Sequence, residues 1–474
     1  MPEEKSDDAT HATKEVLELS ASAAALAGIT FITQPAKVFG ANDRVRVGIC
    51  GLRGQGFFHA ENYAMIPNVE IAAFCDPDAN ILNGRLADLA LMALPQPTTY
   101  SDVRKLLEDK SIDCVSIATP NHWHSLMGIW ACQAGKDVYV EKPGSHNWWD
   151  GHQLVRAAHK YDRMVQHGVN MRASDCIREA VQQLRDGVVG DVYMSRGLCY
   201  NWRDTIGHTP VEPVPAGVDY DLWMGPAPVK PFTRNRFHYN WHWQWDYGNG
   251  DVGNQGIHEL DVARWGLSVG FPNRTSAMGG HFMFDDDQET PNTLTCVWEF
   301  DQPGGKRKLM EFEVRHWITN HEADIRTPGF GIELPGFLGP PRSGPPRQVF
   351  EKGMVGDIFY GSKGYMATTD SGPRQIYRTW LGEGQENGPT ATHEGGNCWA
   401  NFIDCVRSRK RENLLSPIDE GHISCTLVHL ANASYRLGRS IRFDPATEQV
   451  IGDDEANKLL RGTYRAPYVV PDEV

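Results

Sequence analysis

The sequence lacks three features that would point to particular classes of protein. It has no excess of positive charge, since 60 acidic residues against 46 Lys and Arg give a formal net charge of −14, whereas a nucleic-acid-binding protein needs a basic face that neutralises phosphates. None of its ten cysteines forms a C-x-x-C pair, so neither a zinc ribbon nor a disulfide framework is expected. It also shows no internal repeats. We therefore expect no nucleic-acid partner.

No apolar run is long enough to cross a membrane either. Residues 17–32 are rich in Ala, Leu and Ser, but they are fewer than the about twenty that a membrane-spanning helix needs. Their position is typical of a secretory leader, yet acidic residues precede them and Lys14-Glu15 stands where a twin-arginine pair would be. We expect residues 1–42 to be a leader-like or docking segment, with no membrane span. The expected location is cytoplasmic, or periplasmic if this segment is an export leader.

What the sequence does contain is a strand, a glycine turn, a helix, a strand and an acid, in that order. The apolar run at 45–50 is followed by G-L-R-G-Q-G at 51–56, a helical pattern, a second apolar run at 69–75 and Asp76. Glycines allow a tight turn whose backbone N–H groups and helix N-terminus face a pyrophosphate. The pattern G-x-G-x-x-G is imperfect because Arg53 takes the place of its middle glycine. We still interpret this stretch as a dinucleotide site.

Asp76 predicts which dinucleotide binds. It lies about twenty residues beyond the glycine turn, where a carboxylate accepts hydrogen bonds from the ribose hydroxyls and repels a 2′-phosphate. No basic residue follows it in D-P-D at 76–78. The sequence therefore favours NAD over NADP.

Strands alternate with helices from residue 45 to residue 166. Beyond Asp76, the expected strands lie at 113–118, 137–140 and 164–166, and the expected helices at about 79–93, 103–108, 125–134 and 150–161. This alternation indicates an α/β fold with a doubly wound parallel sheet of the Rossmann type. We assign residues 43–167 to this domain.

The pattern then changes. Strand-like runs with few helices between them lie at about 191–199, 275–284, 293–300 and 308–316, and helical patterns return near 399–407 and 420–437. They indicate a second, α+β domain at 168–440 with a largely antiparallel open sheet, which we expect to bind substrate and form subunit contacts. The Gly/Pro-rich residues 319–348 are expected to form a loop over a site or at a subunit contact. Residues 441–474 are expected to be an extended, partly ordered tail.

Several motifs together resemble the Gfo/Idh/MocA family of glucose–fructose oxidoreductases and inositol dehydrogenases. The matching stretches are the glycine turn with Asp76, A-T-P-N-H-W-H at 118–124, A-G-K-D-V at 134–138, E-K-P at 141–143, residues 166–172 and G-N-Q-G-I-H-E-L-D at 253–261. An E-K-P strand end beside a T-P-N-x-x-H turn is the most specific of these. The resemblance covers roughly residues 44–440.

This resemblance implies roles for individual residues. Lys142 matches the family's catalytic lysine, which holds the reacting hydroxyl, and His258 matches the histidine taken as general base. The residues expected at the cofactor are Gly51, Arg53, Gly54, Gln55, Gly56, Asp76, Thr119, Pro120, Asn121, His124, Glu141 and Lys142.

The sequence departs from the family at one catalytic position. The family reads Asp-x-x-x-His, whereas this chain has Asn254 four residues before His258. An amide can orient an imidazole through its carbonyl, but it does not stabilise imidazolium as a carboxylate does. Lys142 is then expected to contribute more to the proton transfer than His258 does. We keep all three residues as catalytic candidates.

An aromatic cluster, H-Y-N-W-H-W-Q-W-D-Y at 238–247, is a candidate carbohydrate site. Aromatic faces stack on pyranoses while polar side chains bind their hydroxyls. The alternatives are a loop buried by its own aromatics and a metal site built on His238 and His242. Alternating Trp favours an extended strand over the helix that such a metal site needs, so no metal is expected. The residues assigned to substrate are Trp123, Arg172, Trp241, His242 and Trp243.

These observations leave three functions open. The first is an NAD-dependent oxidoreductase that acts on a CH–OH group of a sugar, polyol or glycoside. The second is an NAD-dependent glycoside hydrolase or lyase that oxidises its sugar transiently, and the third is a cofactor-binding sensor without catalysis. Lys142 disfavours the sensor, while Asn254 keeps it open. The expected partners are a small carbohydrate and further copies of the chain, as a dimer or tetramer.

Overall fold

Two sheets and the helices packed on them make up the part of the chain that the structure describes. The computed structural model describes residues 44–317, 354–369, 375–382, 388–393 and 395–474. Residues 45–474 form one compact unit. The expected leader-like segment and the Gly/Pro-rich loop therefore lie outside the described residues.

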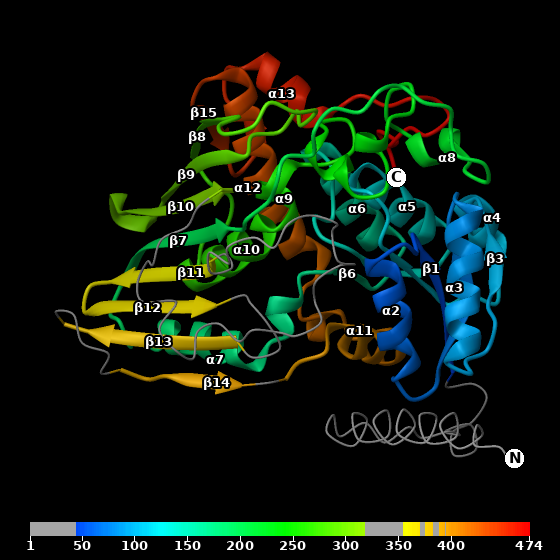
Figure 1. The fold of residues 1–474 in the computed structure, drawn as a ribbon. Coiled ribbons are helices and arrows are strands. Elements are labelled where there is room, and N and C mark those ends of the chain that lie inside the picture. The colour runs from blue at the N-terminus through cyan, green and yellow to red at the C-terminus, as the bar shows by residue number, and fades with distance from the viewer. Residues whose placement is uncertain (1–43, 318–353, 370–374, 383–387, 394) are drawn as a thin grey trace, which may run out of the picture. The chain divides into compact units, whose positions relative to one another are not determined.

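Six parallel strands form the first sheet, in the order β3-β2-β1-β4-β5-β6. Figure 1 labels β1, β3 and β6 among them. They are β1 (Val45–Cys50), β2 (Val69–Cys75), β3 (Thr98–Tyr100), β4 (Cys114–Ile117), β5 (Asp137–Val140) and β6 (Val165–His167). The helices that connect them are α2 (Gln55–Ala64), α3 (Ala79–Leu91), α4 (Val103–Glu108), α5 (Asn121–Gln133) and α6 (Trp148–Lys160). This is the doubly wound parallel sheet that the sequence predicts.

Helices on both faces explain why the strands are so apolar. Val47 and Ile49 of β1 pack into a core with α2, α3 and α11 (Cys398–Ser408). Ile117 and Val138 pack into a second core with α4, α5 and α6. Parallel strands buried on both faces read as continuous apolar runs. The strand order reverses between β1 and β4, and sheets of this kind bind ligands beside the carboxyl ends of the strands at that point.

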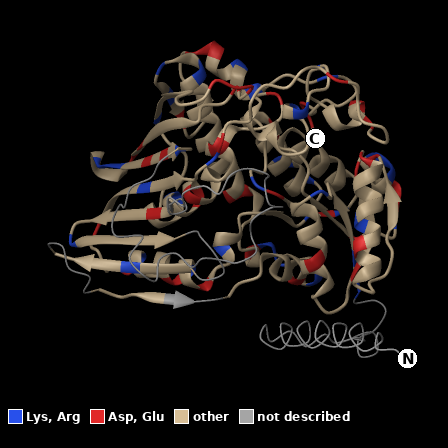
Figure 2. Cartoon of the chain, viewed as in Figure 1, with Lys and Arg blue, Asp and Glu red and all other residues tan. Residues whose placement is uncertain are grey.

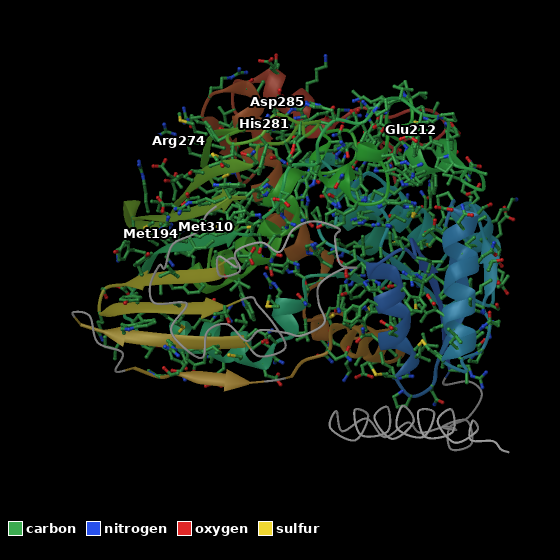
Figure 3. All side chains as sticks on the ribbon, viewed as in Figure 1. Met194, Glu212, Arg274, His281, Asp285 and Met310 are labelled. Atoms are coloured by element: carbon green, nitrogen blue, oxygen red, sulfur yellow. The ribbon has the colours of Figure 1, made fainter. Side chains whose placement is uncertain are left out.

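Ten strands form the second sheet, in the order β14-β13-β12-β11-β7-β10-β9-β8-β15-β16. They are β7 (Val192–Tyr200), β8 (Arg274–Gly280), β9 (Thr293–Asp301), β10 (Arg307–Arg315), β11 (Met354–Gly361), β12 (Gly364–Thr369), β13 (Gln375–Leu381), β14 (Ala391–His393), β15 (Ile441–Asp444) and β16 (Gln449–Val450). Within this sheet, β7 and β10 are the only neighbours among the described strands that pair in parallel, and Figure 3 labels Met194 and Met310 on them. The predicted, largely antiparallel sheet is confirmed, although β11 to β14 were not foreseen.

One face of this sheet packs on helices. Leu294, Cys296, Trp298 and Phe300 alternate along β9 and are all buried. They share a core with α7 (Asp175–Arg185), α10 (Gly256–Leu267) and α12 (Ile418–Leu437). The shorter elements that complete the described chain are η2 (Asn170–Ala173), α8 (Tyr220–Met224), η3 (Arg234–Arg236), η4 (Asn240–Trp243), α9 (Gly250–Asn254), η5 (Pro303–Gly305), η6 (Arg411–Asn413) and α13 (Asp454–Arg461).

The C-terminal residues do not form the extended tail that the sequence suggested. β15 pairs with β8, and α13 packs beside β16. Tyr468, Val470 and Val474 are buried in the core of the first sheet. Each of these pieces is too short for its period to stand out in the sequence, and all of them depend on contacts with distant elements.

Charge is distributed without a dominant sign on the elements in view. Figure 2 shows blue and red residues interspersed along helices and strand ends, with long tan stretches between them. Within the described part of the chain, no helix is both long and apolar enough to cross a bilayer.

Candidate active site

The glycine turn after β1 has the geometry that a dinucleotide site requires. Gly51 has a φ of +80°, and a Cβ there would lie 2.7 Å from the carbonyl oxygen of Ala118. A Cβ on Gly56 would lie 1.6 Å from the carbonyl oxygen of Gly51, so both positions accept glycine alone. Gly54 precedes α2 and gives it no side-chain cap, and a Cβ there would meet nothing within 4 Å. No side chain of the described residues caps the N-terminus of α2, an arrangement that suits a pyrophosphate.

Asp76 closes this turn from the end of β2. Its Oδ2 accepts from the Leu52 N–H at 2.8 Å, and its Oδ1 accepts from the Asp78 N–H at 3.0 Å. Burial raises the pKa of Asp76 to about 6, although both N–H groups favour the carboxylate. Each oxygen keeps a lone pair for a further donor. The residues present thus fit an NAD ribose as well as a pyrophosphate.

Arg53 reaches out of the glycine turn towards the aromatic cluster. Its Nη1 donates to the His238 carbonyl oxygen at 3.3 Å, and its own carbonyl accepts from Arg85. His238 in turn lies 3.1 Å from a carboxylate oxygen of Asp78. This guanidinium links the turn to a segment far away in the sequence.

The T-P-N turn after β4 is part of a helix, which begins four residues earlier than the sequence suggested. Pro120 caps α5, so Asn121 is its first residue. The ring nitrogens of His124 lie 2.7 Å from the carbonyl oxygens of Thr119 and Pro143. His124 therefore fastens the end of β4 to the end of β5. Asn121 is buried beside it.

Trp123 does not offer an open platform for a sugar. Its ring is buried and packs edge-on against Tyr468 and Trp130. Its Nε1 donates to the carbonyl oxygens of Leu222 and Trp223, both at 3.1 Å. These contacts place it in an aromatic core.

Glu141 lies at the centre of a buried polar network. Its Oε1 accepts from Gln55 Nε2 at 3.0 Å and faces His59 Nε2 at 2.9 Å, while its Oε2 accepts from the Lys142 N–H at 3.0 Å. The other ring nitrogen of His59 contacts Ser116 at 2.9 Å. Burial alone would raise the pKa of Glu141, but the hydrogen bond and charge of His59 hold it at about 2. The sequence analysis did not single out His59. The feature that could have indicated it is its position one turn after Gln55, on the inner face of α2.

Lys142 follows β5 and extends towards α9. Its Nζ donates to the backbone oxygen of Asn254 at 2.9 Å and lies 3.4 Å from the Asn254 Oδ1. Burial lowers the pKa of Lys142, whereas the charges of Glu141 and Asp251 act in the opposite direction. The ammonium is thus held between the two parts of the chain.

Asn254 contacts Lys142 and Asp251. Its Nδ2 donates to Asp251 Oδ1 at 3.0 Å. His258 lies one turn further along, on α10, and no described group pairs with its buried Nδ1. Burial and the neighbouring Lys142 ammonium lower the pKa of His258 to about 3. The amide is therefore engaged with the lysine and the acid, while the imidazole is neutral.

Asp251 is the main functional candidate that sequence reasoning missed. Arg203 donates to both its oxygens, Nε to Oδ2 at 2.7 Å and Nη2 to Oδ1 at 3.0 Å, and His316 Nε2 lies 2.7 Å from Oδ2. Although burial opposes the charge, Arg203 and His316 hold the pKa of Asp251 well below its usual range. The sequence feature that could have indicated Asp251 is its position three residues before Asn254, on the same helix turn.

The aromatic cluster is a 3₁₀ turn, so the expectation of an extended strand is wrong. Within η4, His242 stacks on Trp241 with ring centroids 3.6 Å apart, and Trp243 lies under Arg203 at 5.1 Å. Burial lowers the pKa of His242 to about 3, and the charges of Lys142 and Arg203 act in the same direction. Close packing of the flat rings overrides the alternation in the sequence. The cluster therefore packs on itself beside the lysine.

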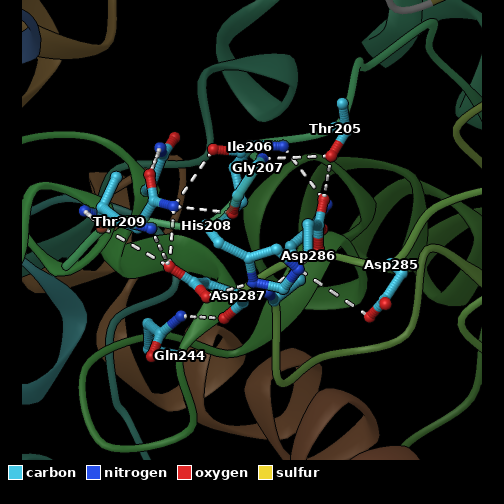
Figure 4. A network of polar contacts seen from close by, with 12 residues as sticks. Thr205, Ile206, Gly207, His208, Thr209, Gln244, Asp285, Asp286 and Asp287 are labelled. Atoms are coloured by element: carbon cyan, nitrogen blue, oxygen red, sulfur yellow. Dashed lines mark hydrogen bonds and ion pairs between the residues drawn. The ribbon is translucent and has the colours of Figure 1, made fainter.

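Asp286 and Asp287 lie in one loop that contacts residues 205–209, and Asp287 also contacts the aromatic cluster (Figure 4). Asp286 accepts from the Ile206 N–H at 2.9 Å. Asp287 Oδ2 accepts from the Thr209 N–H at 2.8 Å, and its backbone oxygen accepts from Gln244 Nε2 at 2.6 Å. Segments around residues 205–209 and 244 are thereby joined to one loop.

Arg172 is taken up by a structural ion pair. Its Nε and Nη2 donate to the carboxylate of Asp261 at 2.6 and 2.9 Å, and its guanidinium lies over Trp265 at 5.1 Å. The whole side chain is buried. Its expected role at the substrate stays a prediction, but its charge is already balanced.

Comparison with known proteins gives matches over most of this unit. The family model described as an oxidoreductase family with an NAD-binding Rossmann fold matches residues 45–169. The model of that family's C-terminal alpha/beta domain matches residues 174–270 and 390–470.

Individual proteins resemble the chain more weakly. A glycosyl hydrolase family 109 protein from Shewanella sp. (strain W3-18-1) is 32% identical over 156 residues, which are 32% of this chain and 34% of that protein. The chain thus spans about a third of the length of the curated relatives it matches. Crystal structures of an aldose–aldose oxidoreductase from Caulobacter crescentus with glycerol (TM-score 0.58) and of the WlbA dehydrogenase from Bordetella pertussis with NADH and UDP-GlcNAcA (TM-score 0.57) share its fold. Both are 18% identical, covering 84% and 85% of this chain and 100% and 99% of theirs.

Proposed function

Because the chain belongs to the Gfo/Idh/MocA family of oxidoreductases, we propose that it transfers a hydride between a carbohydrate CH–OH group and NAD, with Lys142 at the reacting hydroxyl. The observation that carries this proposal is the position of the Lys142 ammonium. Lys142 follows β5 at the carboxyl edge of the first sheet. Its ammonium contacts the backbone and side-chain oxygens of Asn254 at the end of α9. Bound nicotinamide supplies the hydride acceptor.

Lys142 acts on the proton of the substrate hydroxyl. Two of its three N–H donors face Asn254, so one remains for the hydroxyl oxygen. Burial lowers the pKa of the amine, which brings it closer to the range in which it gives up and takes back a proton at Nζ. His258 is neutral and accepts a proton at its imidazole when the hydroxyl ionises. Asp251 and Glu141 offset the charge that builds up between them.

The cofactor residues act by binding and orientation. Gly51, Gly54 and Gly56 expose the N-terminus of α2 to the pyrophosphate, and Asp76 accepts from the adenosine ribose. The Asp76 carboxylate would repel a 2′-phosphate, so NAD is the proposed cofactor rather than NADP. Within the aromatic turn, the half-buried His242 is the proposed sugar contact, because the rings of Trp241 and Trp243 are buried.

Glycoside cleavage is the second candidate, and the family 109 glycosyl hydrolases among the relatives favour it. In that reaction a sugar hydroxyl is oxidised to a ketone, the aglycone leaves, water adds and the hydride returns to the sugar. The cofactor is then regenerated within each turnover. Lys142 would serve the same hydroxyl in both reactions.

One assay separates these functions. The full chain with NAD is incubated with a panel of sugars, polyols and aryl glycosides, while NADH and free aglycone are followed together. Net NADH release identifies a dehydrogenase, and aglycone release without NADH identifies a glycosidase. NAD binding without either product on any compound of the panel would contradict both and favour a sensor.

A further inference from the structure

We propose that His152, His422 and Glu448 bind a divalent transition-metal ion of the zinc class. His152 lies on α6, His422 lies on α12, and Glu448 lies in the turn between β15 and β16. Each offers one ligand atom, and the three atoms lie within 4.8 Å of one another. Imidazole nitrogens with one carboxylate oxygen form a donor set typical of zinc.

The two distances from Glu448 fit ligands of a shared ion, although the contact with His422 is also within reach of a hydrogen bond. Glu448 Oε2 lies 3.3 Å from His422 Nε2 and 3.7 Å from His152 Nδ1, whereas a charge-assisted hydrogen bond is about 2.7–2.9 Å long. Bonds of about 2.0–2.2 Å to a tetrahedral ion place neighbouring ligand atoms roughly 3.3 Å apart. The same two helices provide a comparison, because His159 of α6 lies only 2.6 Å from Asp419 of α12.

Packing fixes the two imidazole rings. Trp148 stacks on His152 with ring centroids 4.8 Å apart and an interplanar angle of 26°. Phe271 meets the His422 ring edge-on at 5.9 Å, and a Cβ on Gly151 would lie 2.7 Å from His422 Nδ1. The rings are therefore held close to their positions before any ion binds, which limits the entropy lost on binding.

His422 and Glu448 have the protonation states that a metal needs. Burial lowers the pKa of His422, so its ring is neutral at pH 7 with a free lone pair. Burial would raise the pKa of Glu448, but its histidine partners hold it at about 2. The side chains of His152 and Glu448 are 31% and 28% exposed. An ion can therefore enter from solvent, and water can complete its coordination.

The site joins three distant parts of the chain. It links α6 of the first sheet's helices to α12 and to the C-terminal hairpin, none of which carries Lys142 or His258. Binding to the folded chain alone would stabilise it by mass action. The inference is therefore independent of the reaction proposed above.

Zinc titration tests this site directly. The full, tag-free chain is stripped with a chelator and titrated with Zn²⁺ by calorimetry in a weakly competing buffer, and Co²⁺ is added in parallel. We expect one Zn²⁺ per chain, a higher Tm, and the intense visible absorption of Co²⁺ in a low-symmetry site of four or five ligands. A chain that binds no stoichiometric Zn²⁺, or whose Co²⁺ shows only a weak octahedral spectrum, would overturn the proposal.

Variants locate the ion. His152→Gln and Glu448→Gln should each weaken Zn²⁺ binding by at least about 10-fold, since even the loss of an outer-shell partner costs that much. His159→Gln is the matched control, because it removes a histidine–carboxylate pair between the same helices. The Tm of each stripped variant reports whether it folds. Equal binding by wild type and both site variants, or an equal loss in His159→Gln, would place the ion elsewhere.

Discussion

Two buried carboxylates meet at Lys142 from different parts of the chain, and they are balanced in different ways. Glu141 has His59 and Gln55 as partners, which lie on the helix that follows the glycine turn. Asp251 is balanced by Arg203 and His316, which come from the second sheet and its connections. A histidine can lose its charge at neutral pH, whereas an arginine does not. The first network thus pairs its carboxylate with a histidine and an amide, and the second pairs its carboxylate with an arginine as well as a histidine.

The largest expected effect comes from removing the residue that both networks share. Lys142→Ala should lower kcat by about 10²–10⁴-fold, the usual contribution of a general acid or base, and leave the affinity for NAD nearly unchanged. NAD binding is measured by calorimetry and turnover by the product assay above. Lys105→Ala, which removes an exposed lysine paired with Glu108, is the control. A variant that keeps most of its kcat would remove Lys142 from the mechanism.

The two carboxylates themselves should differ in their contribution to stability. Asp251→Asn leaves the Arg203 guanidinium uncompensated and should cost about 3–5 kcal/mol of the free energy of unfolding. Glu141→Gln keeps a hydrogen-bonding group and should cost about 1–3 kcal/mol. Urea unfolding at pH 7 measures both. Equal losses would show that the type of cationic partner does not matter here.

Lowering the pH should also distinguish the contribution of Glu141 to stability from that of Asp251. The pKa of Glu141 is about 2 in the folded chain and about 4.3 in an unfolded one. Its stabilising contribution is therefore complete above pH 4.3 and is lost as the pH falls towards 2. The difference between wild type and Glu141→Gln should shrink over that interval. A difference that stays constant down to pH 2 would show that the pKa is not depressed.

The same contrast explains what the sequence could predict. The glycine turn follows β1, Asp76 follows β2 and the E-K-P strand end follows β5, so all three lie at the carboxyl edge of one parallel sheet. Their apolar runs are continuous because both faces are buried. The parallel sheet, the antiparallel character of the second sheet and the family were predicted correctly on this basis.

The Asp251 network could not be found in this way. Arg203 and His316 do not follow a strand of the first sheet, and neither belongs to a recognisable motif. The family pattern also directed attention to Asn254, three residues away from the acid. Similarly, η4 was expected to be a strand because alternation was weighed without the stacking of Trp241 on His242. Tertiary contacts decided both cases.

Asp76 should produce a smaller, pH-dependent effect. Asp76→Ala is expected to reduce the preference for NAD over NADP by about 10-fold, equivalent to about 1.4 kcal/mol. Because burial raises the pKa of Asp76 to about 6, its carboxylate becomes protonated as the pH falls through 6, and the affinity of the wild type for NAD should fall with it. Titrations of both cofactors at pH 5 and pH 8 measure this. Tighter binding of NADP by the wild type would overturn the assignment.

The smallest effect concerns Asn254, which contacts Lys142 and Asp251, and His258 one turn further along. Among the described residues, no carboxylate pairs with the imidazole of His258, and its pKa is about 3. The acidic limb in the plot of kcat/KM against pH should therefore lie at low pH. Asn254→Asp adds a carboxylate one turn away and should move this limb upward, by about one unit for each 1.4 kcal/mol of added imidazolium stabilisation.

Asn254→Asp also places an acid where the amide now donates to Asp251 at 3.0 Å. The two acids repel, which raises the pKa of one of them, and the new charge stabilises the Lys142 ammonium. A double variant, Asn254→Asp with His258→Ala, therefore separates the two sources. If the limb disappears in His258→Ala and stays absent in the double variant, the imidazole is the base. A limb that persists in His258→Ala and moves with Asn254→Asp alone would assign the titration to Lys142 and Asp251 instead.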